Sequence, residues 1–164
     1  MNTLTKADWD SKMPIYEISH ERLFRQGLKC LLLDVDGTLL SKKSIDIPVK
    51  VKEWIYKAKT NFSLYLISNN PSKKRIQRIS SELGINYEYK AFKPSRKITL
   101  NVIRKLNEDN NKIAIIGDRI LTDVIVGNRC NIKTILVRRL NKKGVQVKFN
   151  FTLFIEKFIS FFIF

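Results

Sequence analysis

Apolar and amphipathic segments alternate along the chain. Short runs rich in apolar residues predict β-strands, and they cover residues 29–34, 62–67, 85–91, 112–116 and 132–137. Between them, apolar residues recur at the three- and four-residue spacing of a helix that buries one face. These predicted helices span residues 48–59, 71–83, 98–106 and 123–129. The alternation predicts an α/β fold, a doubly wound parallel sheet with helices on both faces.

Polar residues follow the predicted strands at the points where the strands end. They are, in chain order, Asp34 and Asp36, Ser68, Lys93, and Asp118 with Asp123. Right-handed crossovers place the carboxyl ends of parallel strands at one edge of the sheet, where ligands bind in such folds. We therefore expect these side chains to converge on one site.

The first strand ends in two acids that are separated by one residue. Side chains alternate along a strand, so those of Asp34 and Asp36 are expected to point to the same side. Two carboxylates this close repel each other unless a proton or a cation lies between them. A divalent cation removes that repulsion, and oxygen ligands favour Mg²⁺. The alternative from these residues alone is an ordinary Asp-Gly turn.

The other strand-end residues suit a phosphoryl group. Ser68 offers a hydroxyl beside the backbone N–H groups of Asn69 and Asn70, where Asn70 is expected to cap the next helix and Pro71 to begin it. Lys93 adds a positive charge, and carboxylates, amides and a lysine together favour phosphoryl transfer. The chain has no GxxxxGK[ST], GxSxG or GxGxxG motif, which argues against a P-loop nucleotide site.

Composition adds a strong positive charge. The 164 residues carry 31 Lys+Arg and 15 Asp+Glu, a formal net charge of +16, which attracts phosphorylated substrates, an anionic membrane surface or nucleic acid. A bias toward Lys, Asn and Ile in genomic composition is the alternative explanation. Cys30 and Cys130 lie outside any CxxC motif, so we expect buried thiols in a reducing compartment. Residues 1–10 have no apolar core of a secretory signal, and we expect a cytoplasmic protein.

Taken in order, the motifs resemble those of the haloacid dehalogenase (HAD) superfamily of phosphohydrolases. The matching residues are Asp34-Val35-Asp36-Gly37-Thr38, Ser68, Lys93, and Gly117-Asp118 with Asp123. The resemblance covers about residues 29–138. It implies a Rossmann-like HAD core and a Mg²⁺-dependent phosphoric monoester hydrolase that works through an aspartyl-phosphate.

The resemblance also implies a role for each motif residue. Asp34 would be the nucleophile, and Asp36 would protonate the leaving alkoxide and later deprotonate the hydrolytic water. The expected phosphate-binding residues are Ser68, Asn69 and Lys93. The expected metal ligands are Asp34, the main-chain carbonyl of Asp36, Asp118, and Asp123 directly or through a ligand. Thr38 would brace the loop.

The motif spacing leaves no room for a large cap domain. Besides the strand that ends before Ser68, residues 38–68 hold one loop and one helix, and residues 68–93 hold one helix and one short strand. The site resembles the capless IIIA-class (YqeG-type) branch. The resemblance rests on Ile67-Ser68-Asn69-Asn70, residues 89–94, and residues 116–124 with 127–129. Members of that branch include phosphatidylglycerophosphate phosphatases of phosphatidylglycerol biosynthesis. This implies a phospholipid substrate and disfavours nucleic acid as a partner.

We expect three parts in the chain. Residues 1–28 form an N-terminal extension that packs on the core, with a short helix that Ser19 caps; residues 29–140 form the phosphatase core; residues 141–164 form a basic, Phe-rich tail. As a helix, the tail would present a wide apolar face and a narrow polar strip that includes Glu156. With the basic residues from Arg138 to Lys148, it suits an in-plane anchor on an anionic membrane. Packing on the sheet or in a dimer is the alternative.

Two other functions stay open. The same core and charge would suit a phosphatase of small soluble or nucleic-acid phosphomonoesters. A phosphoacceptor signalling domain is more remote, because the middle strand, residues 85–91, offers only Glu88 as an acid. His20, the only histidine, is expected to have no catalytic role.

Overall fold

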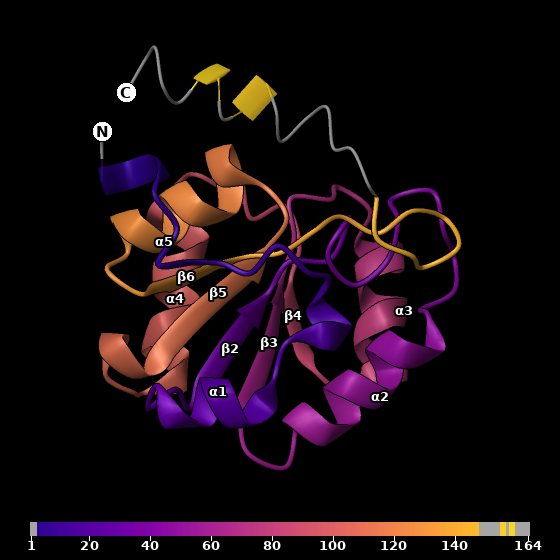
Figure 1. The fold of residues 1–164 in the computed structure, drawn as a ribbon, viewed down its shortest axis with the longest axis horizontal. Helices are drawn as coiled ribbons and strands as arrows, with labels where there is room; N and C mark the ends of the chain where they lie inside the picture. The colour runs from indigo at the N-terminus through magenta and orange to yellow at the C-terminus, as the bar shows by residue number, and fades with distance from the viewer. Residues whose placement is uncertain (1–2, 148–154, 157, 160–164) are drawn as a thin grey trace.

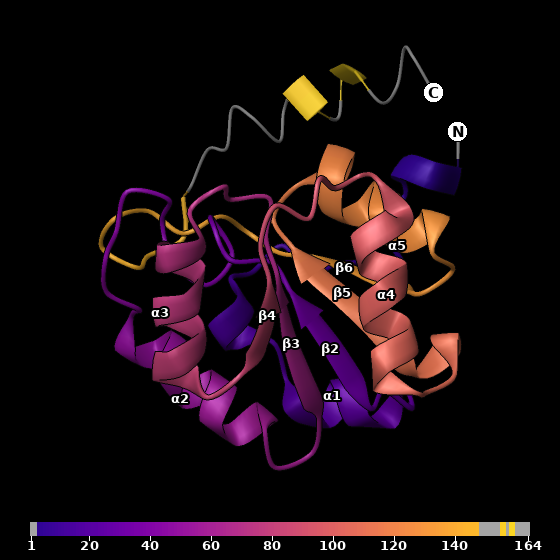
Figure 2. The ribbon, with the colours of Figure 1, turned by 180° about the vertical axis from the view of Figure 1, so that it is seen from behind.

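The computed structural model describes residues 3–147, 155, 156, 158 and 159. Within this part of the chain, six parallel strands form one sheet in the order β1-β6-β5-β2-β3-β4 (Figures 1 and 2). The strands are Trp9–Asp10 (β1), Cys30–Leu33 (β2), Ser63–Ile67 (β3), Asn86–Glu88 (β4), Ile113–Gly117 (β5) and Lys133–Leu136 (β6). The α-helices are His20–Arg25 (α1), Val49–Ala58 (α2), Lys73–Leu83 (α3), Arg96–Leu106 (α4) and Ile125–Arg129 (α5). The predicted doubly wound α/β fold is confirmed.

The chain is wound in two directions from the central strand β2. β3 and β4 extend the sheet on one side, and β5 and β6 extend it on the other. Since the crossovers are right-handed, α2 and α3 cover one face and α4 and α5 the other, as both views show (Figures 1 and 2). Leu31 and Leu33 pack in the core beneath α2 and α3. Cys30 and Leu32 pack beneath α4 and α5, because strand side chains alternate between faces.

Local capping residues set the ends of α1 and α3. The Ser19 hydroxyl accepts from the Arg22 N–H at the start of α1, as expected, and Gly84 ends α3 in the left-handed conformation with φ 62°. The expected cap of α3 at Asn70 is wrong: Ser72 caps that helix by accepting from the N–H of Arg75. Asn70 instead belongs to the loop before the helix and turns its side chain toward the site.

Two segments near the site are less regular than the sequence predicts. The strand expected over residues 85–91 is only the three-residue β4, because Lys90 (φ 49°) and Phe92 (φ 54°) adopt left-handed backbone conformations that interrupt pairing. The helix expected from Asp123 with Thr122 as cap begins differently. A π-helical turn, Ile120–Val124, precedes α5, and no side chain caps it.

The residues before β2 are part of the sheet and of its cover. Trp9 in β1 pairs with Ile135 in β6 at the edge of the sheet, and the indole N–H of Trp54 donates to the Ile18 carbonyl at 2.7 Å. Leu23 of α1 is fully buried in the same core as α2. The two-residue strand β1 is too short to produce an alternating pattern, so the sequence did not reveal it.

Candidate active site

The predicted site residues lie at the carboxyl ends of the central strands, where the winding direction changes. Leu33 of β2 pairs with Leu66 of β3 and with Ile116 of β5, so the residues that follow these three strands are neighbours. A cavity of about 190 Å³ opens at this edge. Its lining includes Asp34, Asp36, Ser68, Asn69, Lys93, Arg119 and Arg139.

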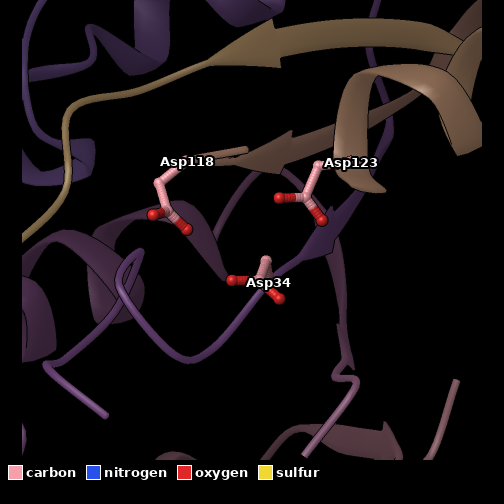
Figure 3. Close-up of side chains that lie close together, drawn as sticks. All are labelled: Asp34, Asp118 and Asp123. Atoms are coloured by element: carbon pink, nitrogen blue, oxygen red, sulfur yellow. The ribbon is translucent and has the colours of Figure 1, made fainter. Parts of the chain in front are cut away.

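Three buried carboxylates converge behind this cavity. Asp34, Asp118 and Asp123 point toward one another (Figure 3), each offers an oxygen within 4.8 Å of the others, and they are 7%, 1% and 2% exposed. The Lys93 ammonium lies between two of them, 2.7 Å from Asp34 Oδ1 and 2.6 Å from Asp123 Oδ1. It also donates to the Ile67 carbonyl at 2.9 Å. We call these four side chains the inner cluster.

Further contacts hold the inner cluster in place. The Thr38 hydroxyl lies 3.2 Å from Asp34 Oδ2 and 3.3 Å from Asp118 Oδ1, which matches its expected bracing role. Arg139 Nε donates to Asp118 Oδ2 at 2.7 Å. The packing is close: a Cβ at Gly37, where φ is 104°, would lie 2.6 Å from Asp118 Oδ2. Glycine is therefore required there by both the backbone and the neighbouring acid.

The electrostatics of the inner cluster show an excess of negative charge. Burial, reinforced by the neighbouring carboxylates, raises the pKa of Asp34 to about 7 despite Lys93. Burial likewise raises the pKa of Asp118 to about 6 despite Arg139. Burial alone would lower the pKa of Lys93, but the Asp123 and Asp34 carboxylates outweigh it and raise that pKa. Three convergent carboxylates offer hard oxygen donors, and burial disfavours the ionised forms of Asp34 and Asp118, which fits a divalent cation such as Mg²⁺.

The three residues expected to hold phosphate, Ser68, Asn69 and Lys93, all line the cavity. Ser68 is 1% exposed, and its Oγ accepts from the Asn70 N–H at 3.1 Å, which leaves the hydroxyl hydrogen for another acceptor. The Asn69 side chain is bonded to the backbone of Lys93 in both directions, at 2.7 and 2.8 Å. Asn69 thereby ties the loop after β3 to the loop that carries the lysine.

Asp36 lies apart from the inner cluster. Its Oδ2 accepts from Asn70 Nδ2 at 2.5 Å, and its Oδ1 accepts from Arg75 Nη2 at 2.9 Å. Arg75 also donates to the carbonyls of Ser41 and Ser44, so it joins α3 to the loop after the first motif. We call Asp36, Asn70 and Arg75 the outer rim. The Asp36 carboxylate is therefore not among the grouped carboxylates, and its expected metal contact was through the main-chain carbonyl.

Sequence reasoning missed the functional environment of several charged residues. Arg138 and Arg139, expected to serve a membrane-facing basic run, instead pair with Asp10 at 3.1 Å and Asp118 at 2.7 Å. Arg75 is one of several cations in α3, and nothing in the sequence singles it out as the partner of Asp36. Helical periodicity carries no signal for such partners, because each lies more than twenty residues away along the chain or beyond a loop.

Glu156 corrects one expectation about the tail. It is 2% exposed, and its carboxylate accepts from Arg119 Nε at 2.9 Å and from the Ile120 N–H at 2.8 Å. It therefore does not belong to a solvent-facing polar strip. Apart from residues 155, 156, 158 and 159, the Phe-rich segment 149–164 on which the amphipathic helix was expected lies outside the described residues.

Strand-end carboxylates, a buried lysine and a hydroxyl at a topological switch point define a phosphoryl-transfer site on a doubly wound sheet. Residues 91–150 match the family model described as HAD-hydrolase-like. The probable phosphatase YqeG of Bacillus subtilis (strain 168) is 32% identical over 137 residues, which cover 83% of this chain and 80% of that protein. The chain belongs to the HAD superfamily, in its YqeG-type branch, and it is a phosphoric monoester hydrolase.

Solved structures agree on the fold. An uncharacterized protein from Listeria monocytogenes serotype 4b has a TM-score of 0.56 and 19% identity, covering 77% of this chain and 86% of its own. The cobalt-bound deoxy-D-mannose-octulosonate 8-phosphate phosphatase of Haemophilus influenzae has a TM-score of 0.52 and 15% identity, covering 82% of this chain and 87% of its own. At these identities the likeness supports the fold alone.

Proposed function

We propose that this phosphatase is Mg²⁺-dependent, works through an aspartyl-phosphate on Asp34, and dephosphorylates phosphatidylglycerophosphate to phosphatidylglycerol at the cytoplasmic face of a membrane. The observation that carries the chemical part is the inner cluster, in which a nucleophile-type carboxylate touches a buried ammonium at 2.7 Å and borders the cavity. A phosphate monoester in that cavity would meet Asp34, Ser68 and Lys93 together.

In this proposal the carboxylates have different roles. Asp34, Asp118 and the main-chain carbonyl of Asp36 would bind Mg²⁺, while Asp123 holds Lys93 at 2.6 Å and would complete the site directly or through a ligand. Bound Mg²⁺ would neutralise charge on the phosphoryl oxygens and on the nucleophile. The raised pKa of Asp34, about 7 without a cation, supports this requirement, because only the ionised carboxylate is a nucleophile.

The reaction would proceed in two displacements at phosphorus. An oxygen of Asp34 attacks, the ester bond breaks, and Asp36 gives its proton to the leaving alkoxide. Ser68, the Asn69 N–H and Lys93 stabilise the charge on the transferred group. Asp36 then removes a proton from water, which attacks the acyl-phosphate and releases inorganic phosphate and free Asp34. Asp36 must separate from Arg75 or retain only part of that contact to carry the proton.

The size of the cavity supports a large, surface-presented substrate. The cavity volume of about 190 Å³ is below the 300–1,000 Å³ that is typical of sites enclosing a whole ligand. It accommodates a phosphoryl group and a small part of its alcohol, and leaves the remainder of a substrate outside. Among the described helices, none has the length and apolar character to cross a membrane.

The direct test is Mg²⁺-dependent phosphate release from phosphatidylglycerophosphate in mixed micelles, measured beside a panel of soluble phosphomonoesters. We expect the highest kcat/KM for the lipid, and no turnover of any ester by Asp34→Asn. Turnover of soluble esters with an inert lipid would contradict the lipid assignment and leave the chemistry standing. Turnover by Asp34→Asn would contradict the chemistry.

The second candidate is a phosphatase of small soluble or nucleic-acid phosphomonoesters. The charged and polar residues that line the cavity, among them Asp34, Ser68 and Lys93, suit the phosphoryl group of any monoester, so a compact ester would be bound there without a lipid surface. The same panel separates the two candidates, because a soluble-ester enzyme would show its highest kcat/KM on one of those esters.

A further inference from the structure

Three exposed apolar side chains stand around the active-site edge of the sheet. Ile45, Phe92 and Val145 are 65%, 69% and 53% exposed. Each belongs to a loop at the carboxyl ends of the strands, the upper edge in Figures 1 and 2. Exposed apolar side chains that gather on one face of a soluble fold mark an interaction surface.

Each of the three is anchored next to the cavity. Ile45 lies in the loop whose Ser41 and Lys42 line it, and Phe92 directly precedes Lys93. Val145 follows the cavity-lining Leu140, which pairs with Gln146 across a short turn. The loops of Ile45 and Val145 also contact each other, through Ser44 Oγ and the Lys142 carbonyl at 3.4 Å. The loops that carry the three apolar side chains therefore border one opening.

Phe92 is held outward at a conformational cost. Its φ of 54° is in the left-handed region, which a bulky residue avoids, and its ring is 69% exposed and gains little from the core. Neither local backbone preference nor burial explains this aromatic side chain. An outlier of this kind at the mouth of a site indicates a function.

Lysines surround the same opening. Lys42, Lys43, Lys90, Lys142 and Lys143 are exposed, and none of them forms an ion pair with an acid in the described part of the chain. The acid in these loops, Asp46, lies 4.0 Å from Arg78. Unpaired lysines between apolar side chains suit a surface that is anionic outside and apolar beneath.

We propose that this edge of the molecule docks on an anionic lipid bilayer, with Ile45, Phe92 and Val145 entering the interface and the lysines contacting headgroups. The cavity then opens toward the bilayer, and a phosphorylated headgroup reaches Asp34 without leaving the membrane. We call this edge the docking face. The inference extends the proposed lipid substrate, but docking itself is measurable without any turnover.

The test uses the full chain and vesicles of phosphatidylcholine with or without phosphatidylglycerol, and measures cosedimentation. We expect wild type to bind only the anionic vesicles, and less at high salt. Ile45→Ser/Val145→Ser should bind these vesicles at least about tenfold more weakly, with unchanged turnover of p-nitrophenyl phosphate. The matched control is Phe24→Ser on α1, because Phe24 is 63% exposed away from the docking face; it should bind like wild type.

Phe92→Asn gives a second, independent readout. Asparagine tolerates the left-handed region better than phenylalanine, so this variant should keep or raise the melting temperature and still lose vesicle binding. Loss of binding here is therefore not loss of folding. Heparin distinguishes a lipid surface from a general polyanion: Lys142→Gln/Lys143→Gln should weaken binding to both, and Ile45→Ser/Val145→Ser should weaken only binding to vesicles.

Three results would overturn the docking face. They are wild type that does not bind anionic vesicles, apolar variants that bind as wild type does, and an equal loss for Phe24→Ser. Equal loss of heparin binding in the apolar variants would show a polyanion site instead. Vesicle binding by a protein that is inert on phosphatidylglycerophosphate would contradict the proposed substrate and leave the docking face intact.

Discussion

The inner cluster and the outer rim carry acids two residues apart, yet different parts of the fold hold them. Asp34 and Asp118 directly follow β2 and β5, and the parallel register of these strands sets their positions. Lys93 lies in the loop after β4, and Asp123 lies in the π-helical turn after β5. Asp36 is held by residues before and within α3 and is joined through Arg75 to a loop. Strand register therefore places Asp34 and Asp118, whereas the outer positions depend on how loops pack.

Burial separates the two regions energetically. The Lys93 and Asp123 side chains are 1% and 2% exposed, while those of Arg75 and Asp36 are 20% and 16% exposed. In the inner cluster, a charged side chain that loses its partner stays buried and cannot be solvated by water. In the outer rim, water can solvate the remaining charge. The same type of ion pair therefore has different consequences in the two places.

The largest expected effect separates the two acids by function. Asp34→Asn should abolish turnover of every ester, a loss of more than about a thousandfold. Asp36→Asn should give a burst of about one equivalent of p-nitrophenol from p-nitrophenyl phosphate and then stop, because that leaving group needs no proton but the acyl-phosphate needs a base. Rapid-quench kinetics measure the burst. A burst from Asp34→Asn would reverse the assignment.

The next effect compares the two ion pairs by stability. Lys93→Met leaves buried carboxylates without their ammonium and should lower the free energy of unfolding by about 3–5 kcal/mol. Arg75→Met, in the partly hydrated rim, should lower it by only about 1 kcal/mol. Urea denaturation with a chelator present measures both. Equal losses of unfolding free energy would mean that water is excluded from the outer rim as completely as from the inner cluster.

In the metal-free protein, the free energy of unfolding should depend on pH through the buried carboxylates of the inner cluster. The folded-state pKa values of Asp34, about 7, and Asp118, about 6, lie above the unfolded value. The folded protein then binds more protons than the unfolded chain between about pH 4 and pH 7, so the free energy of unfolding falls as the pH rises through this window. The fall amounts to roughly 1.4 kcal/mol for each unit by which a pKa is raised. Denaturation at several pH values with a chelator checks this.

Magnesium supplies the contrast for that titration. Excess Mg²⁺ should reduce the fall, because a bound cation favours the ionised carboxylates. A profile that is the same with and without Mg²⁺ would contradict a metal site formed by these carboxylates.

The smallest expected effect concerns Thr38, whose hydroxyl touches both Asp34 and Asp118. Thr38→Val keeps the shape and removes this hydrogen bond, and should lower the free energy of unfolding by about 1 kcal/mol. Mg²⁺ affinity should fall by about tenfold or more, because the side chain orients two expected ligands. Isothermal titration measures the affinity. An unchanged affinity would limit Thr38 to a structural role.

Much of the fold and of the inner cluster follows from local pattern. Apolar runs predicted five of the six strands, and Ser19 and Gly84 marked helix ends because capping depends on a few neighbouring residues. β1 was not predicted, because a strand of two residues has no alternating pattern of apolar and polar side chains. The shortened β4 and the π-helical turn were not predicted from the sequence. Near the site, the backbone adopts the conformation that places Lys93 and Asp123 and not the one that regular pairing would give.

The sequence by itself determined that Asp34, Asp36, Ser68, Lys93, Asp118 and Asp123 follow strands, since alternation and topology require only short-range information. The tertiary structure alone decided which charged side chains form ion pairs with one another. Of the 31 Lys and Arg residues, Arg75 forms an ion pair with Asp36, Arg139 with Asp118 and Arg119 with Glu156. The tertiary structure also left Ile45, Phe92 and Val145 exposed to solvent in loops at the same edge of the sheet. Such choices depend on distances between loops, which no local period encodes.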